Sequence, residues 1–544
     1  MKRRSFIKLG ATASAFALMP FDVKSMLQSV ENMAGCDFSG RRLVLINLAG
    51  GNDGLNTVIP LNQYDLYANL RPTIKVPETG VNGLVGLDGT LPSDQLIGLN
   101  PAMIGFKNIY DQGWLRIIQS VGYPKQNKSH FASTDLIMTG NDGNSLANGN
   151  LSGWIGRFME THYDNELEEK YPLAIQIGSL VNSIGFHGVE EHGMAMNLTN
   201  QDPSGFYSVI NGLGGEPPAS IPNSDYGIEL EHLIQTDKLA NVYAESVSSS
   251  FDKGSNMVTY PDTDIADQLK TVAKLISGGL QSKIYMVRLS GFDTHALQVD
   301  DNEDVQGKHH RLLSELSDAV ASFCNDLDGL GVGDDVVGLT YSEFGRKAKE
   351  NGQGGTDHGE IAPMFVFGKG VKGGVSGTNP GLTEAKEENN HQVETVQFDY
   401  RSVLSSLLQN FMGAGDEIID DAFFDHSNAK SFTTDPIESV LKATHVVDPS
   451  CQTNSVLNPI VHVEGNYSVS PNPLKDLLTI RSDEDIRSVF IEVYTASGRT
   501  AFSENVVFSN GMAVIDLGYL PKGVHVMSIA GDNGTKEQLK LVKK

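Results

Sequence analysis

The sequence predicts an α/β domain, with a mostly parallel sheet flanked by helices, followed by a small all-β sandwich. Short apolar runs between residues 43 and 367 are typical of strands that are buried on both faces of a sheet. Residues 311–323, which have apolar side chains at helical spacing, separate two of these runs, and such alternation favours a parallel sheet. Beyond residue 466, short β-rich runs alternate with turn sequences instead.

Five apolar runs form the predicted strands of the large domain, which we assign to residues 40–430. They lie at residues 43–48, 117–121, 284–289, 336–340 and 364–367. Strands joined through helices usually run parallel, and in such sheets the functional residues gather beyond the carboxyl ends of the strands. The segments that follow these strands are therefore the first places to look for a site.

The composition is that of a folded, acidic protein with more than one domain. A chain of 544 residues is too long for one ordinary domain, and its net charge of −26 disfavours nucleic acid and anionic membranes as partners. After the N-terminus, no apolar run is long enough to span a membrane as a helix. The cysteines show no zinc-binding spacing, and we expect free thiols, with one disulfide as the open alternative.

The N-terminus has the pattern of an export signal. Arg3 and Arg4 precede a short apolar run that contains alanines suited to cleavage. Residues 1–20 therefore resemble a twin-arginine signal peptide, the alternative being the basic start of an ordinary helix. The resemblance implies the twin-arginine export machinery as a partner, which carries folded proteins, often with a cofactor inserted.

The C-terminus resembles a second export signal. Residues 431–465 are rich in Thr, Asp, Pro and Ser and are predicted to be a linker. Residues 466–544 then contain, in order, Ser470–Pro473, Val493–Tyr494 running into Gly498–Arg499, Leu520–Val524 and a basic end. This set resembles the C-terminal sorting domain of the type IX secretion system, which implies that machinery as a partner and a location at the cell surface or in the medium. The alternative is a carbohydrate-binding or adhesive sandwich.

Polar clusters accompany all five strands of the large domain. They lie at residues 50–54, 127–133, 291–295 and 342–346, each after a strand, and at residues 355–359, just ahead of one. A single cluster of this kind is more often a turn or a helix cap than a site. Taken together, the clusters indicate a functional site. Their carboxylates and imidazoles are ligands for a divalent metal, with zinc or manganese favoured.

The clusters and their neighbours resemble one bacterial family. The motifs at residues 48–56, 121–124, 129–131, 292–295, 342–346 and 355–359 are similar to those of a family of exported proteins of unknown function, over residues 40–415. That family is placed in the alkaline phosphatase and sulfatase superfamily. The resemblance implies an alkaline phosphatase-like fold for the large domain, but it does not bring a known activity with it.

Superfamily members suggest roles for most of these residues, and the chemistry of their side chains suggests roles for His130 and Arg346. Ser129 matches the nucleophile that opens a helix, while His130 is expected to orient a phosphate or to bond a loop. Arg346 is expected to clamp an anionic substrate, with an internal ion pair as the alternative. The implied metal ligands are Asp53, Asp293, His295, Glu343 and His358. Two departures stand against a simple transfer: Ser342–Glu343 replaces an Asp–His pair, and the cysteine or serine that sulfatases modify is absent.

Two functions follow from these residues. The first is an exported, metal-dependent hydrolase of phosphate or sulfate esters, with a small anionic ester as substrate. The second is a non-catalytic surface protein that binds or scaffolds a partner and keeps only the fold. The replaced ligand pair motivates the second function, as does the spacing of Asp293 and His295, which is closer than is usual in the superfamily.

Overall fold

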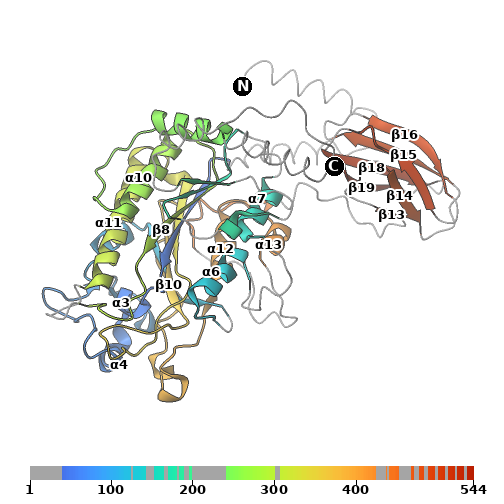
Figure 1. Cartoon of the computed structure of the whole chain (residues 1–544). Helices are drawn as coiled ribbons and strands as arrows, with labels where there is room; N and C mark the ends of the chain where they lie inside the picture. Colours follow the sequence, from blue (N-terminus) through green and yellow to red (C-terminus); the bar gives the residue numbers. More distant parts are fainter. Residues whose placement is uncertain are drawn as a thin grey trace, which may run out of the picture. The chain divides into compact units, whose positions relative to one another are not determined.

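The computed structural model describes residues 39–123, 126–141, 152–163, 170–179, 183–188, 195–198, 241–299, 307–423, 437 and 440–452, and parts of 467–543. The chain divides into two compact units, a large one that ends at Thr453 and a small one that begins at Asn454 (Figure 1). The predicted twin-arginine signal, residues 1–20, lies outside the described residues and stays a prediction.

A nine-stranded sheet forms the centre of the large unit, as far as the structure describes it. Across the sheet the strands are β11 (Gly374–Ser376), β5 (Leu115–Gly122), β10 (Ala362–Phe367), β9 (Val336–Tyr341), β1 (Arg42–Ala49), β8 (Ile284–Ser290), β6 (Ala174–Ile177) and β7 (Ala195–Leu198), while β12 (Phe398–Asp399) also pairs with β5. β1 is parallel to both of its neighbours, β8 and β9. All eight residues of β1 are buried, as expected for a strand that is covered on both faces.

One strand of this sheet runs against the others. β10 is antiparallel to β5 and to β9, whereas the other described pairs in the sheet are parallel. Between β9 and β10, residues 342–361 form no helix. A parallel return would need a long crossover, usually a helix, so a non-helical connection of this kind fits an antiparallel neighbour. The segment ahead of β10 therefore lies at the carboxyl edge of the parallel strands.

Helices cover both faces of the sheet (Figure 1). One face packs on α5 (Ile104–Asp111), α10 (Asp264–Ser277) and α11 (Lys308–Gly329), and the other packs on α6 (His130–Thr139), α7 (Trp154–His162), α12 (Tyr400–Asn410) and α13 (Asp416–Ala422). β1 contributes side chains to both apolar cores: Val44 and Ile46 lie in the first, and Leu43 and Leu45 lie in the second. The predicted fold class is confirmed: a mostly parallel sheet lies between helices.

A smaller substructure follows β1. The short helix α3 (Gly54–Thr57) leads into β2 (Val58–Pro60), which pairs with β4 (Ile97–Leu99), and β4 also pairs with β3 (Val85–Gly86). α4 (Tyr64–Leu70) lies between β2 and β3 in the chain and packs in a separate small apolar cluster. Arg71, the residue after α4, is fully buried, and its ion pair is described with the site.

The small unit consists of β-strands around one apolar core. Its two sheets are β13 (Tyr467–Ser470), β14 (Leu477–Ser482) and β17 (Met512–Asp516), and β16 (Thr500–Val507), β15 (Ser488–Thr495), β18 (Gly523–Gly531) and β19 (Lys536–Lys543). Side chains of both sheets, such as Ile480 and Ile491, share the core. Two antiparallel sheets around one core are the predicted sandwich.

Part of the predicted linker belongs to the large unit. Val440, Leu441 and Val447 are buried, and Leu441 pairs with Val371 in the large unit, so residues 440–452 do not form a free spacer. The expectation of free thiols is correct for Cys324, which is buried, and wrong for Cys451, which is disulfide-bonded. No described helix is both long enough and apolar enough to cross a membrane.

Candidate metal centre

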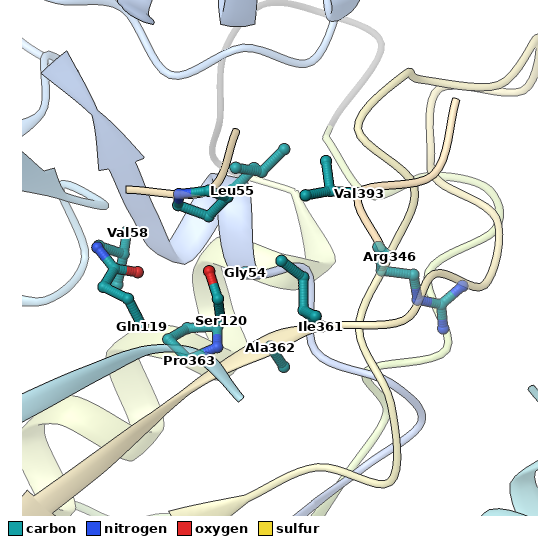
Figure 2. A pocket seen from close by; sticks show the side chains of 11 residues that line it. Gly54, Leu55, Val58, Gln119, Ser120, Arg346, Ile361, Ala362, Pro363 and Val393 are labelled. Atoms are coloured by element: carbon teal, nitrogen blue, oxygen red, sulfur yellow. The ribbon is translucent and has the colours of Figure 1, made fainter. Parts of the chain in front are cut away.

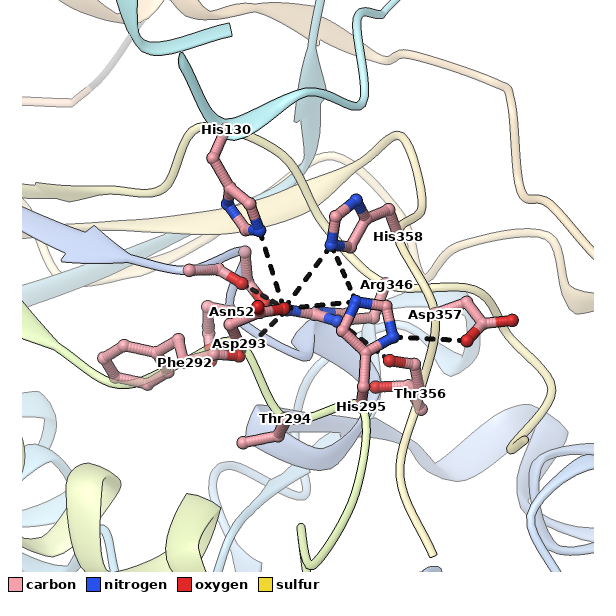
Figure 3. Close-up of polar contacts among 12 residues, drawn as sticks. Asn52, His130, Phe292, Asp293, Thr294, His295, Arg346, Thr356, Asp357 and His358 are labelled. Atoms are coloured by element: carbon pink, nitrogen blue, oxygen red, sulfur yellow. Dashed lines mark hydrogen bonds and ion pairs between the residues drawn. The ribbon is translucent and has the colours of Figure 1, made fainter. Parts of the chain in front are cut away.

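The polar segments of the large unit meet at one edge of the sheet. In the parallel register Ala49 lies beside Ser290 and Asn47 beside Tyr341, so the loops after β1, β8 and β9 start at the same level. The start of α6 and the segment ahead of β10 reach the same place, which brings His130, Asp293, His295 and His358 together (Figure 3).

Asp293 lies at the centre of this cluster. Its Oδ1 atom is 3.2 Å from Nε2 of His295, 3.4 Å from Nε2 of His358 and 3.5 Å from Nε2 of His130. About half of the Asp293 side chain is exposed (48%), so the cluster is open to solvent. Three imidazole nitrogens thus lie around one carboxylate oxygen. A group of His130, Asp293 and His358 has the geometry to hold a metal ion.

Each histidine is held through its other ring nitrogen. Nδ1 of His130 is 2.7 Å from Oε1 of Glu343, and Nδ1 of His295 is 3.3 Å from Oδ1 of Asp357. Nδ1 of His358 is 2.8 Å from the Lys128 carbonyl oxygen. Each Nδ1 faces an acceptor, so a proton on Nδ1 would direct the Nε2 lone pair into the cluster, the arrangement typical of metal-binding histidines.

One contact inside the cluster is compatible with a bound cation. The Nε2 atoms of His295 and His358 are 2.9 Å apart, while both Nδ1 atoms face acceptors. Two nitrogen lone pairs at this distance repel each other unless a proton or a metal ion lies with them. The observed arrangement therefore fits a bound cation, and the donor set of imidazoles and a carboxylate suits zinc.

Glu343 is a buried support for His130. Its side chain is 4% exposed, and its Oε1 atom also accepts a hydrogen bond of 2.8 Å from the Gly50 N–H. The Glu343 backbone carbonyl accepts hydrogen bonds from Ser133 and Gln126. The hydrogen bond to Glu343 raises the pKa of His130 above its ordinary value. The sequence assigned Glu343 as a ligand, whereas the structure places it behind one.

Arg346 ties the loops of the site together. Its guanidinium donates to the carbonyl oxygens of Gly50, Gly51, Phe292 and Thr356 and, at 2.8 Å, to Oδ1 of Asp293. The Arg346 side chain is fully buried. Its nitrogens are thus engaged by the protein, so we assign it a positioning role in place of the predicted substrate clamp.

Burial and the charge of Arg346 shift the pKa values of Asp293 and His358. Burial acts to raise the pKa of Asp293, but the hydrogen bond and the charge of Arg346 outweigh it, and the pKa lies below its ordinary value. Burial, together with the Arg346 charge, lowers the pKa of His358. Both shifts favour the forms that bind a metal ion, a carboxylate and a neutral imidazole.

Asp53 is not among the converging side chains. Its carboxylate is fully buried, forms a 2.6 Å ion pair with Arg71 and accepts a hydrogen bond from Gln298. Burial acts to raise the pKa of Asp53, but Arg71 lowers it below its ordinary value. Oδ2 of this anion is thus paired with a buried arginine, which stabilises the fold, whereas its buried Oδ1 atom has no hydrogen-bond partner among the described residues. The predicted ligand role of Asp53 stays a prediction.

Ser129 also stands apart from the cluster. It is the exposed N-cap residue of α6, directly before His130, and its hydroxyl does not cap the helix. Its backbone N–H donates to Oδ1 of Asn127. No hydrogen bond joins its hydroxyl to a described residue. The expectation that it is the nucleophile stays a proposal.

The sequence-based assignment missed Asp357. This residue supports His295 and is itself bonded to Lys347 (3.1 Å) and Asn351 (3.2 Å). It lies in the same Gly–Thr–Asp–His–Gly segment as His358. An acidic residue directly beside a candidate histidine was the available signal, because metal-binding histidines usually have a carboxylate or carbonyl partner.

Two of the hollows beside the described part of the site differ in size. A cavity of about 500 Å³ is lined by His130, Asp293 and Glu343 among others. The hollow in Figure 2, beside Leu55 and Ile361, has a volume of only about 20 Å³, enough for one water molecule. Only the larger cavity has room for a substrate.

Two families match parts of the chain. Residues 273–405 match a family described as a protein of unknown function, DUF1501, and this range contains Asp293, His295 and His358. Residues 468–544 match the secretion system C-terminal sorting domain. The predicted sorting domain is thereby confirmed, and it directs the protein through type IX secretion to the cell surface or the medium. No curated protein matches the chain.

Solved structures resemble the chain at low identity. The PsFucS1 sulfatase from Pseudoalteromonas sp. is 11% identical, with 92% of this chain and 88% of that one covered and a TM-score of 0.29. An alkaline phosphatase superfamily protein from Vibrio parahaemolyticus is 8% identical, with 92% and 82% covered and a TM-score of 0.30. A DUF3244 family protein from Bacteroides vulgatus with an immunoglobulin-like β-sandwich fold is 16% identical, with 15% and 87% covered and a TM-score of 0.14. With TM-scores this low, the case for a function comes from the side chains of the site.

Proposed function

We propose that the large unit is a metal-dependent hydrolase of phosphate or sulfate esters, which acts after secretion. The observation that carries the proposal is the convergence of three Nε2 atoms on Asp293 Oδ1, with every Nδ1 facing an acceptor. Such a set is costly without a cation, because it gathers lone pairs and a negative charge at one half-exposed point.

The residues that would hold the ion are His130, Asp293, His295 and His358. Zinc suits this donor set best, with manganese second. A bound divalent ion would supply Lewis-acid activation of an ester oxygen or of water. Glu343 and Asp357 would orient two of the rings, and Arg346 would hold Asp293 in place. The chemistry class itself comes from the superfamily that the sequence motifs resemble.

Ser129 remains the proposed nucleophile because it immediately precedes His130 at the start of α6. Its exposed hydroxyl is free to approach a substrate. Once an esterase activity is detected, Ser129→Ala should abolish most of it while the metal content stays unchanged. Full activity in this variant would assign the attack to water in place of Ser129.

The second candidate is a non-catalytic surface protein. Two observations favour it: the Arg346 guanidinium is used within the protein, and the Ser129 hydroxyl forms no hydrogen bond to a described residue. This candidate predicts that simple phosphate and sulfate esters are not turned over at all. It does not by itself account for the converging histidines.

Metal content tests the proposal. The full chain, purified without chelator, should contain about one equivalent of zinc or manganese by elemental mass spectrometry, because three imidazoles and a carboxylate make one ligand set. Asp293→Ala/His358→Ala should lose it. The matched control is Asp334→Ala/His445→Ala, which removes another Asp–His pair, 3.1 Å apart and outside the cluster, and should keep the metal.

Hydrolysis assays complete the test. Metal-loaded protein should hydrolyse 4-nitrophenyl phosphate or 4-nitrophenyl sulfate, and the double variant in the cluster should not. A folded wild type that takes up no metal even after loading would overturn the proposal. A metal-loaded protein with no activity on a broad ester panel would favour the non-catalytic candidate.

A further inference from the structure

The cavity beside the histidine cluster has the size of a small-molecule site. Its volume of about 500 Å³ falls within the range of roughly 300–1,000 Å³ that is usual for such sites. It lies at the ends of β1 and β8 and along the first turns of α6, and His130 and Asp293 form part of its wall. A molecule in the cavity would thus lie directly against the proposed metal ligands.

Asn47 supplies the first sign of a ligand. It is 2% exposed and lines the cavity from β1, on the same face of the strand as Leu43 and Leu45. No hydrogen bond joins its side-chain amide to a described residue. Because this side chain lines the cavity, its amide is suited to bond a polar ligand there.

Phe131 supplies the second sign. It is 86% exposed, and it lines the cavity one residue after His130. A large aromatic ring that is left in solvent beside a polar cavity offers a flat surface to a ligand. The electron-rich face of such a ring attracts the C–H groups on the apolar face of a sugar.

The remaining polar groups surround the cavity on several sides. Arg288 lines it from β8 and brings a positive charge. Thr134, Asp135 and Ser290 bring hydroxyl and carboxylate oxygens. A ligand with hydroxyl groups in several directions could pair with this wall, whereas an alkyl or aryl group would desolvate it without replacing the lost hydrogen bonds. Polar atoms around one exposed aromatic ring therefore fit a carbohydrate.

We propose that this cavity binds the sugar part of a sulfated or phosphorylated carbohydrate. The ester group reaches the histidine cluster, Phe131 packs on the ring, and Asn47 bonds a hydroxyl. This inference deepens the proposed hydrolase function and rests on it for the role of the ester group. The binding of the sugar itself can be measured without turnover.

The test uses calorimetry or ligand-observed NMR to measure how a panel of sulfated and phosphorylated mono- and disaccharides binds to the full, metal-loaded chain. Unsubstituted sugars, phenyl sulfate and adenosine monophosphate serve as comparison probes. Phe131→Ala and Asn47→Ala should each weaken binding of the best panel member by about fivefold to tenfold. Tyr519→Ala removes an exposed aromatic of the small unit and should change nothing.

The outcomes separate this inference from the proposed function. Metal content should be unchanged in Phe131→Ala, since Phe131 is no ligand. Bound metal without binding of any panel member, or tighter binding of phenyl sulfate or adenosine monophosphate, overturns the sugar assignment and leaves the metal site intact. Sugar binding that depends on Phe131 in a protein without metal supports the pocket and overturns the hydrolase.

Discussion

Glu343→Gln tests whether a buried carboxylate sets the metal affinity of His130. Glu343 lies 2.7 Å from Nδ1 of His130 and is 4% exposed, so water screens the pair little. Glutamine keeps the shape of the side chain and can still accept from Nδ1–H and from the Gly50 N–H, but it lacks the charge. The ring should stay in place while its Nε2 atom becomes a weaker donor.

The expected loss is large enough to measure. Removing such a supporting carboxylate typically costs roughly 10–100-fold in metal affinity. In free energy this is about 1.4–2.7 kcal/mol at 25 °C, because each tenfold step is about 1.4 kcal/mol. A competition titration of zinc against a chromogenic chelator, on the full chain at fixed pH, gives the affinity. Thermal unfolding of the metal-free variant shows whether the fold itself has changed.

Asp357→Asn is the matched control. Asp357 supports His295 in the same way, but at 3.3 Å, with a side chain that is 43% exposed and also bonded to Lys347. Solvent weakens an ion pair of this kind, so its loss should reduce the affinity by less than about threefold. Equal losses in the two variants, or no loss in Glu343→Gln with an unchanged melting temperature, would refute the reasoning.

Three further predictions concern buried groups. Arg71→Met should lower the free energy of unfolding by about 3–5 kcal/mol, because it leaves the buried Asp53 carboxylate unpaired; urea unfolding measures this, and a loss under about 1 kcal/mol would contradict it. Since Arg71 lowers the pKa of Asp53 against the effect of burial, Asp53 stabilises the fold above its unfolded pKa of about 3.9, and this stability disappears as the pH falls through the lower folded value. In a plot of the free energy of unfolding against pH, Asp53→Asn should therefore make the acid side less steep. An unchanged plot would show that this ion pair does not cause the loss of stability at low pH. Burial raises the pKa of Cys324 to about 12, so a thiol reagent should modify Cys324 only upon unfolding, and rapid reaction of the native protein would show that the site opens.

The meeting of Asp293, His295 and His358 could be anticipated from the sequence. Apolar runs separated by a helical segment indicate parallel strands, and parallel strands bring their carboxyl ends to one edge. For Asp293 and His295, this rule is sufficient. For His358, which precedes its strand, it works only because β10 is antiparallel. The absence of a helical pattern in residues 342–361 is the signal in the sequence for that reversal.

The sequence alone could not show which acidic residue would bind a metal and which would support a histidine ring. Asp53 and Glu343 both follow buried strands, and nothing in their spacing shows how deep each side chain lies. Asp53 pairs with Arg71 from the segment after α4, which no periodic pattern links to β1. Glu343 is held by the Gly50 N–H and meets His130. Which acid binds a metal and which supports a ring depends on these partners, and partners are a property of the packed structure.

The supporting contacts bear on the choice between an enzyme and a scaffold. A surface protein without a metal would gain stability if apolar side chains replaced the cluster, because unpaired polar groups gathered at one point cost free energy. The chain instead keeps an acceptor behind every Nδ1 atom and uses Arg346 to hold Asp293 against the three Nε2 atoms. Arg346 also bonds the loop carbonyls, so its loss would disturb folding and ligand geometry together. Glu343 and Asp357 each act on one ring, which is why they, and not Arg346, can separate the metal site from the stability of the fold.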